Sequence, residues 1–199
     1  MSDLVHVVVD LETLGLEQDA VVLSLGASTF RMDGSRPKFD KMISEGFYAK
    51  FDVKEQVKTF KRTMTDSTID WWKTQGAAAK KVLEATPFDH RMADGLIEFN
   101  AWLKKVGYNF QKSYIWSRGT YFDFPKIEHM YRQAEVECGY NGWKIRDVRT
   151  YIDILTGVDN GKYEPEGGTP QQFVAHDALH DAAMDGYRMQ EIFNKMSAE

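Results

Sequence analysis

Apolar and polar positions near the start of the chain fall into three short runs of the kind that form β-strands. Residues 5–9 and 21–30 are rich in β-branched and other apolar side chains, and a turn containing Gly15 separates them. Residues 46–51 form a third run of the same kind. This pattern predicts a meander of three strands.

Further along, apolar residues recur three or four positions apart, which is typical of helices. Asp66 or Ser67 can cap the first such segment, and Pro125 suits the first turn of a later helix. Short apolar runs between these segments predict more strands. The predicted helices cover 68–75, 89–107, 125–134 and 177–196, and the additional strands cover 113–117 and 145–148.

This order of elements predicts an α/β fold, in which a mixed β-sheet is flanked by α-helices. The chain has 199 residues, with 43% hydrophobic and 28% charged positions and no repeat or linker, so we expect a single domain covering residues 1–199. No apolar run approaches the roughly 18 residues that a membrane span needs. No export signal is visible, and Cys138 has no partner for an internal disulfide. We therefore expect a cytoplasmic protein without a membrane partner.

The net charge of -5 argues against a polybasic protein that binds nucleic acid by neutralising many phosphates. It is compatible with an enzyme whose acidic site holds phosphates through divalent cations, because the cations reverse the local charge.

Two acidic residues one position apart, Asp10 and Glu12, follow the first apolar run. Successive side chains of a strand alternate between faces, so these two carboxylates point the same way and can share a cation. The end of a sheet strand is also where α/β folds place ligands. Alone, such a pair is more often an ordinary turn after a core strand.

Two later acidic residues change this picture. Asp123 precedes the helix that Pro125 is expected to start, where a carboxylate suits the positive end of the helix dipole and could serve only as a cap. Asp181 lies in a helix otherwise stocked with Ala and Leu, five positions after His176. Four carboxylates can bind two hard divalent cations, and Mg²⁺ or Mn²⁺ is favoured because no cluster of Cys or His competes.

Three segments, read together, resemble the DEDDh branch of the 3′ to 5′ exonucleases, which share the ribonuclease H-like fold. The first motif resembles "VVVDLETLGL" at 7–16, the second "YFDFPKI" at 121–127, and the third, a His followed after four residues by Asp, is matched by His176 and Asp181. The related branch with Tyr would need that residue at position 177, which is Asp here.

One departure from the DEDDh pattern precedes the second motif. Many members have a His-Asn pair where this chain has Arg118 and Gly119, which puts an Asn contact to the substrate in doubt. The Trp-x-Arg-Gly form is similar to the phage exonuclease A type and to the mycobacterial exoribonuclease-like group. The likeness extends over nearly the whole chain.

The resemblance implies a ribonuclease H-like mixed β-sheet flanked by α-helices and a two-metal phosphodiester hydrolase. Asp10, Glu12, Asp123 and Asp181 would be the metal ligands, with Asp10 bridging two Mg²⁺ ions that Mn²⁺ could replace. Two ions about 3.5 to 4 Å apart can clamp an in-line phosphoryl displacement. His176 would be the general base, a task that suits imidazole. His180 is expected to have a structural or peripheral role.

Substrate contacts are harder to predict. Exposed aromatic residues can stack on unpaired bases. Trp71 and Trp72 are adjacent and cannot share one helix face, so at least one of them is expected in the core. Leu14 could wedge against the terminal base, as the equivalent residue does in similar enzymes. The predicted substrate-binding residues are Thr13, Leu14, Trp72, Arg118 and Phe122, whereas Lys126, Arg146 and Arg149 have no stronger support than other surface cations.

Three function classes remain. The preferred one is an exonuclease that removes nucleoside 5′-monophosphates from single-stranded DNA 3′ ends, because the likeness to the phage type is closest. The second is an exoribonuclease that trims RNA 3′ ends. The third is a non-catalytic nucleic-acid-binding module, which the complete set of carboxylates disfavours. Similar enzymes are often dimers, so the resemblance also raises a homodimer, and it raises a phage-encoded protein in the host cytoplasm.

Overall fold

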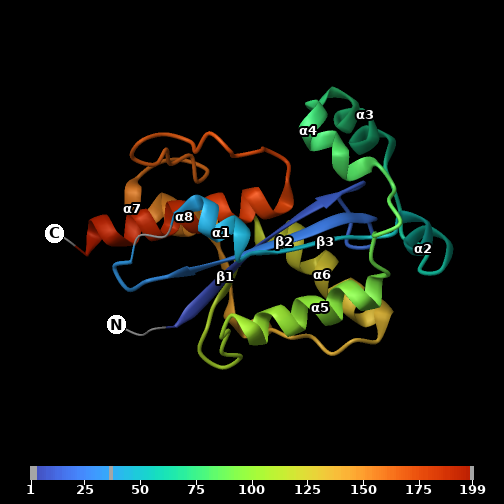
Figure 1. Cartoon of the computed structure of the whole chain (residues 1–199), viewed down its shortest axis with the longest axis horizontal. Helices are drawn as coiled ribbons and strands as arrows, with labels where there is room; N and C mark the ends of the chain where they lie inside the picture. Colours follow the sequence, from blue (N-terminus) through green and yellow to red (C-terminus); the bar gives the residue numbers. More distant parts are fainter. Residues whose placement is uncertain (1–3, 36–37, 198–199) are drawn as a thin grey trace.

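The computed structural model describes residues 4–35 and 38–197. These residues form a five-stranded sheet in the order β3-β2-β1-β4-β5 (Figure 1). The N-terminal strands pair antiparallel, and β4 and β5 extend the sheet in parallel with β1. The strands are β1 (Val5–Thr13), β2 (Val22–Arg31), β3 (Phe47–Lys50), β4 (Ile115–Ser117) and β5 (Ile145–Asp147). The predicted mixed sheet flanked by helices is confirmed.

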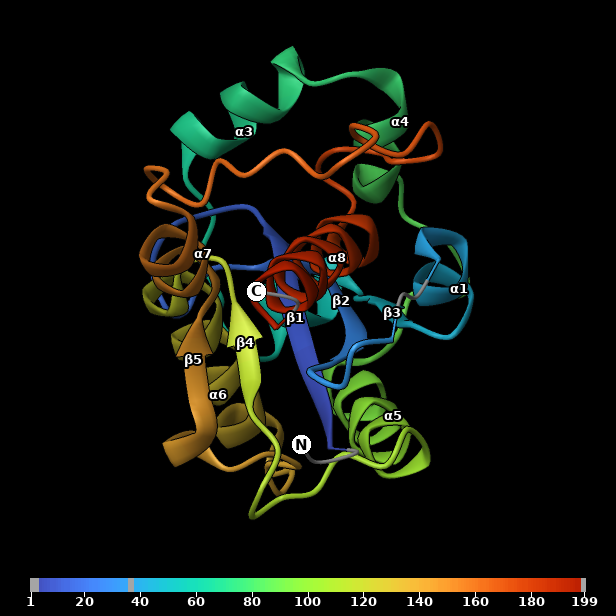
Figure 2. The same cartoon turned by 90° about the vertical axis from the view of Figure 1, so that its left-hand side faces the viewer.

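Helices cover both faces of the sheet. One face carries α5 and α6, the other carries α8 with α1 and α7, and α3 and α4 lie beyond the strand ends toward which β1 runs (Figures 1 and 2). The helices are α1 (Phe39–Ser44), α2 (Val53–Lys58), α3 (Asp66–Thr74), α4 (Ala77–Lys80), α5 (Met92–Lys105), α6 (Thr120–Ala134), α7 (Val148–Thr156) and α8 (Ala178–Met196), with short 3-10 turns at Lys81–Leu83 and Gly142–Lys144.

Three predicted helix starts are wrong by a few residues, and one of them is that of α5, which begins at Met92 rather than at 89. The helix expected at Pro125 begins at Thr120, and its N-cap is Gly119 with a φ of 94°. Pro125 is therefore the sixth residue of α6 and lies inside the helix, where its missing N–H leaves the carbonyl of Tyr121 without its usual helical donor. Asp123 is consequently a residue of the first turn rather than a cap. The N-cap of α3 is Thr65, one residue before the predicted candidates.

Alternate residues of β1 face different layers. Val7, Val9 and Leu11 belong to the hydrophobic core on the side of α5 and α6, whereas Val8 packs in the core beneath α8. Because the side chains of a strand alternate, the even-numbered positions that follow Val8 also face the α8 layer. Asp10 and Glu12 occupy those positions, in line with the prediction that they share a face.

The start of α8 lies directly on the backbone of β2. Gly26 of β2 pairs with Asp10 of β1, and a Cβ added to Gly26 would fall 2.1 Å from backbone atoms of Ala178 and Leu179. No side chain fits in that space, so a glycine is required for this close approach. The contact places the first turn of α8 over the part of β1 that carries the carboxylates.

Among the described residues, none of the helices combines the length with the apolar character that a bilayer-spanning segment needs.

Gly26→Ala is expected to lower the free energy of unfolding by about 3 kcal/mol, because a methyl group there overlaps the α8 backbone and overpacking of this kind forces main-chain shifts. Urea denaturation followed by circular dichroism measures the change. Gly76→Ala is the matched control: Gly76 has a φ of -65° and no atom within 4 Å of its added Cβ, so the change there should stay below about 1 kcal/mol. Equal stability of the two variants would contradict this account of the α8 contact.

Candidate active site

Carboxylates from three separate elements meet near the end of β1. They are Asp10 and Glu12 of β1, Asp123 in the first turn of α6, and Asp181 in the first turn of α8. A cavity of about 570 Å³ opens at this point, and Asp10, Glu12 and Asp181 line it. Asp123 is only 1% exposed, yet its charge is close enough to raise the pKa of Asp10. The fold therefore brings together the acidic residues that lie far apart in the sequence.

A β-bulge ends the regular alternation of β1 beside these carboxylates. Glu12 pairs with Ser24 of β2, but Thr13 pairs with Val22, so the register shifts between Glu12 and Thr13. Bulges re-aim side chains and commonly occur next to functional sites. Glu12 remains the last residue of β1 in regular alternation with Asp10.

Burial and the charges of nearby carboxylates raise the pKa of each carboxyl group. Burial raises the pKa of Asp10 well above its usual range, and the neighbouring carboxylates add to this shift. Burial, followed by the charge of Asp181, raises the pKa of Glu12 to about 8. Burial raises the pKa of Asp123 and that of Asp181 to about 7. Like charges held so close need protons or a cation to balance them.

The donor set fits a divalent cation. Glu12, His176 and Asp181 each offer one ligand atom, and these atoms lie within 4.8 Å of one another. The Oδ1 atom of Asp123 is buried and has no hydrogen-bond partner among the described residues. A buried carboxylate oxygen without a partner costs free energy that a cation can offset. Carboxylate oxygens are the ligands that Mg²⁺ and Mn²⁺ prefer.

His176 lies just before α8 with a left-handed backbone conformation, at a φ of 62°. Its backbone N–H donates a hydrogen bond of 2.8 Å to Oδ2 of Asp181, and its ring meets the Trp71 ring edge-on at 4.9 Å between centroids. Burial lowers the pKa of the imidazole. His180, in contrast, accepts a hydrogen bond from the backbone N–H of Val174 through Nδ1, in line with the expected structural role.

Three of the predicted substrate-binding residues, Thr13, Arg118 and Phe122, line the cavity. The hydroxyl of Thr13 donates to the backbone carbonyl of Gly15, so it is already engaged. Phe122 is partly exposed, and Nζ of Lys126 lies 3.5 Å from the centroid of its ring.

The other two, Trp72 and Leu14, are buried in a hydrophobic cluster and do not line the cavity. Trp72 is 1% exposed, and its Nε1 donates to the carbonyl of Thr13. Their neighbours Trp71 and Leu16, at 41% and 67% exposed, line the cavity instead. The expectation that one tryptophan of the pair packs in the core is confirmed, and the buried one is Trp72, the residue predicted to bind substrate. The rotation of α3, which decides between the two, is set by packing.

Asp185, one of several residues of the cavity wall that were not predicted from the sequence, pairs with Arg118. Asp185 is 4% exposed and binds Arg118 through both of its oxygens, so this arginine is engaged by protein groups. The sequence did contain an indication of its position: Asp185 follows Asp181 by four residues, and residues four apart on a helix share a face. Lys126 is also occupied, because Nζ donates to the carbonyls of Leu16 and Phe122.

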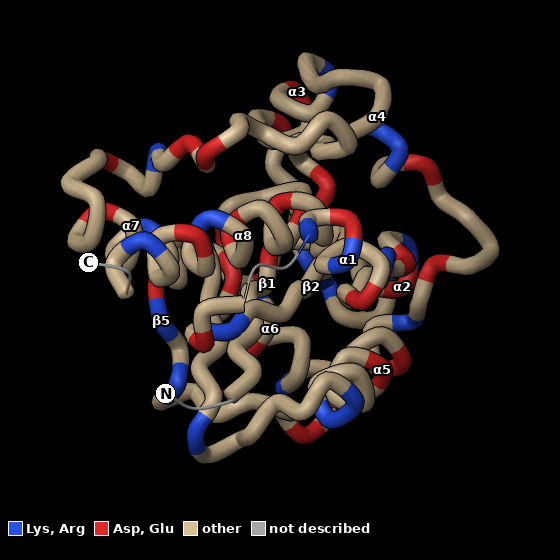
Figure 3. The backbone as a smooth tube through the Cα atoms, turned by 60° about the vertical axis from the view of Figure 1, so that its left-hand side comes forward, with Lys and Arg blue, Asp and Glu red and all other residues tan. Residues whose placement is uncertain are grey.

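The described backbone carries acidic and basic positions interspersed rather than gathered into one basic stripe (Figure 3). This agrees with the net charge of -5 and with a site that meets phosphates locally.

Comparisons with known proteins agree with this geometry. Residues 5–193 match the model of the family described as the 3′-5′ exoribonuclease Rv2179c-like domain. The chain is 33% identical over 193 residues to the exodeoxyribonuclease of Enterobacteria phage T4, covering 89% of this chain and 84% of the phage protein.

Solved structures of nucleases share the fold. Cell-death related nuclease 4 (CRN-4) has a TM-score of 0.59 at 14% identity, covering 98% of this chain and 64% of that one. The complex of E. coli ExoI with single-stranded DNA has a TM-score of 0.58 at 13% identity, with 98% and 43% covered. The nuclease domain of 3′hExo, a DEDDh family member, has a TM-score of 0.50 at 13% identity, with 93% and 90% covered. The chain thus spans less than two thirds of the first two.

The predicted ribonuclease H-like fold is confirmed by these likenesses. The match over residues 5–193, together with the identity to the phage exodeoxyribonuclease, shows that the chain belongs to the Rv2179c-like family and is a 3′ to 5′ exonuclease of the DEDDh type.

Proposed function

We propose that this exonuclease removes nucleotides from the 3′ ends of single-stranded DNA and releases nucleoside 5′-monophosphates. Asp10, Glu12, Asp123 and Asp181 hold two Mg²⁺ ions, which Mn²⁺ can replace, and His176 is the general base. The observation that carries this proposal is that the carboxylates and His176 are gathered around one cavity, although they come from distant parts of the sequence.

The carboxylates supply the oxygen ligands. Besides burial, the charges of the other three carboxylates each raise the pKa of Asp10, so Asp10 lies close to all of the groups that would hold the cations. When bound, divalent cations neutralise charge on the phosphoryl group and make a coordinated water more acidic. In their absence, burial and the charges of nearby carboxylates keep the pKa of each of these groups raised.

His176 accepts the proton of the attacking water. Because burial lowers the pKa of its imidazole, the ring is neutral at pH 7 and has a free lone pair for this task. The hydrogen bond from its backbone N–H to Asp181 and the edge contact with Trp71 hold the ring beside the carboxylates. Water then attacks the phosphorus of the last linkage, the bond to the 3′ oxygen of the preceding nucleotide breaks, and the terminal nucleotide leaves as its 5′-monophosphate.

Trp71, Phe122 and Leu16 provide the apolar part of the cavity wall. An unpaired base can stack on an aromatic ring for about 1 to 3 kcal/mol, whereas a paired base is held within its duplex. This favours single-stranded 3′ ends.

DNA is preferred over RNA because the phage T4 relative is an exodeoxyribonuclease and a structural neighbour is a complex with single-stranded DNA. RNA is the second candidate substrate, because the matching family is described by an exoribonuclease activity. A non-catalytic binding module is the least supported alternative, since all four carboxylates and the histidine are present.

Asp10→Asn is expected to raise the free energy of unfolding by about 1 kcal/mol or more at pH 8 without divalent cations. The folded-state pKa of Asp10 lies above its unfolded value, so its ionised form costs stability at this pH, and the neutral amide removes that cost. The activity of the variant should also fall by roughly 10²-fold or more. Its Tm should no longer rise when Mg²⁺ is added. Urea denaturation, Mg²⁺ titration of Tm and a nuclease assay measure these effects.

Asp70→Asn on α3 is the matched control, because Asp70 is exposed and pairs only with the equally exposed Lys73. Its stability and activity should stay near those of the wild type. An Asp10→Asn protein that is destabilised and remains active would be inconsistent with a cation site at Asp10.

His176→Ala is expected to lower kcat by roughly 10²- to 10⁴-fold, which is the contribution of a general base, while the rise in Tm with Mg²⁺ is kept. Single-turnover kinetics and thermal unfolding measure the two properties separately. His90→Ala serves as the control, because His90 pairs with Glu98 and does not line the cavity. Turnover near the wild-type rate would refute the assignment of His176 as the general base. Loss of the rise in Tm with Mg²⁺ would indicate that His176 is a metal ligand instead.

Digestion of 5′-labelled single-stranded DNA, RNA of the same sequence and blunt duplex DNA tests the substrate. We expect a ladder that starts at the 3′ end of the single-stranded DNA with Mg²⁺ or Mn²⁺, slower cleavage of the duplex, and no cleavage with a chelator. Faster laddering of RNA would favour the second candidate. No cleavage of any substrate would favour the binding module.

A further inference from the structure

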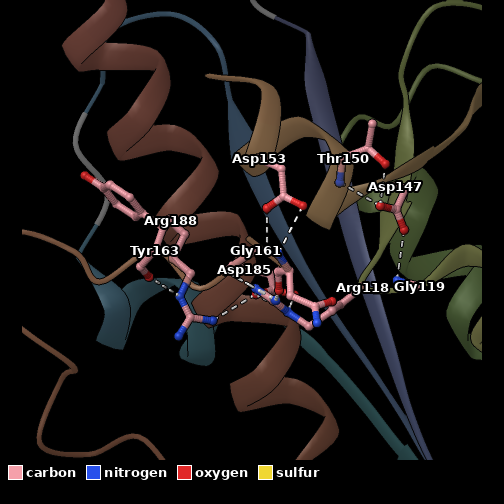
Figure 4. Close-up of polar contacts among 10 residues, drawn as sticks. Arg118, Gly119, Asp147, Thr150, Asp153, Gly161, Tyr163, Asp185 and Arg188 are labelled. Atoms are coloured by element: carbon pink, nitrogen blue, oxygen red, sulfur yellow. Dashed lines mark hydrogen bonds and ion pairs between the residues drawn. The ribbon is translucent and has the colours of Figure 1, made fainter. Parts of the chain in front are cut away.

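Three arginines line the cavity in the part of the chain that the structure describes: Arg118, Arg149 and Arg188. Two of them share Asp185, as Figure 4 shows. Arg118 binds both oxygens of Asp185 at 2.6 to 3.1 Å, and Arg188 binds Oδ1 of Asp185 at 3.0 Å. Their charges are therefore partly balanced within the protein.

The remaining donors of these two arginines hold the segment after α7 in place. Arg118 donates to the carbonyls of Asn160 and Gly161, and Arg188 donates to the carbonyl of Tyr163 (Figure 4). Turning either guanidinium toward a substrate would break these bonds and weaken the pairing of the buried Asp185, which is costly. Arg118 and Arg188 are consequently structural parts of the wall.

Arg149 differs from both of them. It is exposed, and within the described ranges 4–35 and 38–197 it makes neither a hydrogen bond nor an ion pair. Its guanidinium lies over Gly119, where an added Cβ would come within 3.4 Å of Nη1. The missing side chain at position 119 leaves room for the guanidinium beside the cavity. The planar group thus has five N–H donors available for an anion.

The carboxylate of Asp147 accepts hydrogen bonds at the start of α6 and at the start of α7, and this fixes the backbone around Arg149. One oxygen of Asp147 accepts from the N–H of Gly119 at 3.0 Å, and the other accepts from the N–H of Thr150 in α7 at 2.8 Å (Figure 4). The first oxygen also accepts from the N–H of Thr120, the first residue of α6, at 3.4 Å. The turn leading to Asp123 and the first turn of α7 are thereby joined through one carboxylate. Arg149 therefore has a defined position relative to the metal-ligating residues.

We propose that Arg149 binds the backbone phosphate immediately upstream of the scissile one. This inference rests on the proposed function: once the terminal linkage lies at the carboxylates, the 3′-terminal nucleotide has no other phosphate, so a second phosphate contact must be to the preceding linkage. Arginine is suited to it, because its fork of donors matches phosphate oxygens. The contact selects substrates at least three nucleotides long, since a dinucleotide without a 5′ phosphate has only the scissile linkage.

The test compares Arg149→Ala with Arg146→Ala on three thymidine substrates. They are a trinucleotide, the same trinucleotide with a neutral methylphosphonate at its upstream linkage, and the p-nitrophenyl ester of thymidine 5′-monophosphate, which has one phosphate. Arg146 is the control, because it is exposed nearby on β5, bonds to the carbonyls of Trp143 and Ile145, and does not line the cavity.

Arg149→Ala should lower kcat/KM on the native trinucleotide about 10-fold, in line with the loss of a charge-assisted hydrogen bond. It should also reduce the slope of log affinity against log salt by about 0.7, the value for one phosphate of a single strand. The p-nitrophenyl ester should be cleaved at the wild-type rate. In the wild type, the methylphosphonate should lower kcat/KM relative to the native trinucleotide. In Arg149→Ala the two trinucleotides should have the same kcat/KM. Arg146→Ala should behave like the wild type on all three substrates.

An equal loss on the one-phosphate ester, or a methylphosphonate penalty that persists in Arg149→Ala, would overturn the assignment. If the wild type cleaved none of these substrates, the proposed function would fail, but the phosphate contact would still be tested by binding. Fluorescence anisotropy with a labelled trinucleotide should then show weaker binding by Arg149→Ala only when the upstream linkage is charged, and equal binding by both proteins would refute the contact.

Discussion

The direct contact between the backbone of Gly26 and the first turn of α8 determines where the active site can form. Gly26 is the cross-strand partner of Asp10, so the helix that packs on it arrives beside the carboxylates of β1. Asp181 lies in that first turn, and His176 immediately precedes the helix. A larger residue at position 26 would lift the helix and move both groups away from Glu12.

This packing makes the site electrostatically unfavourable until a ligand arrives. Its own burial, followed by the charges of the neighbouring carboxylates, raises the pKa of Asp10 well above its usual range, and the shift of Glu12 follows from the same two causes. The fold moderates the cost by placing Asp123 and Asp181 in the first turns of α6 and α8, where helix dipoles favour negative charge. The fold loses stability locally by holding these carboxylates together, which is the arrangement that the proposed cation site needs.

Local patterns in the sequence were sufficient to predict those parts of the site that depend on strand alternation and on motif spacing. The shared face of Asp10 and Glu12 followed from the period of a strand, and the fold class followed from the order of the elements. That Trp72 and Leu14 are the buried residues could not be predicted, because the rotation of α3 and the bulge after Glu12 depend on packing that no short stretch of sequence contains. The pairing of Arg118 with Asp185 joins residues 67 positions apart, so only the tertiary structure identifies which arginine is occupied.

The position of Arg149 over Gly119 also constrains how this family can vary. Gly119 has a φ of 94°, which other residues rarely adopt, and a side chain there would crowd the guanidinium. Asp147 in turn serves both helix starts, so its loss would release two turns at once. Positions 119, 147 and 149 are therefore expected to change together during evolution, and relatives with a larger residue at 119 would have to recognise the substrate backbone by a different group.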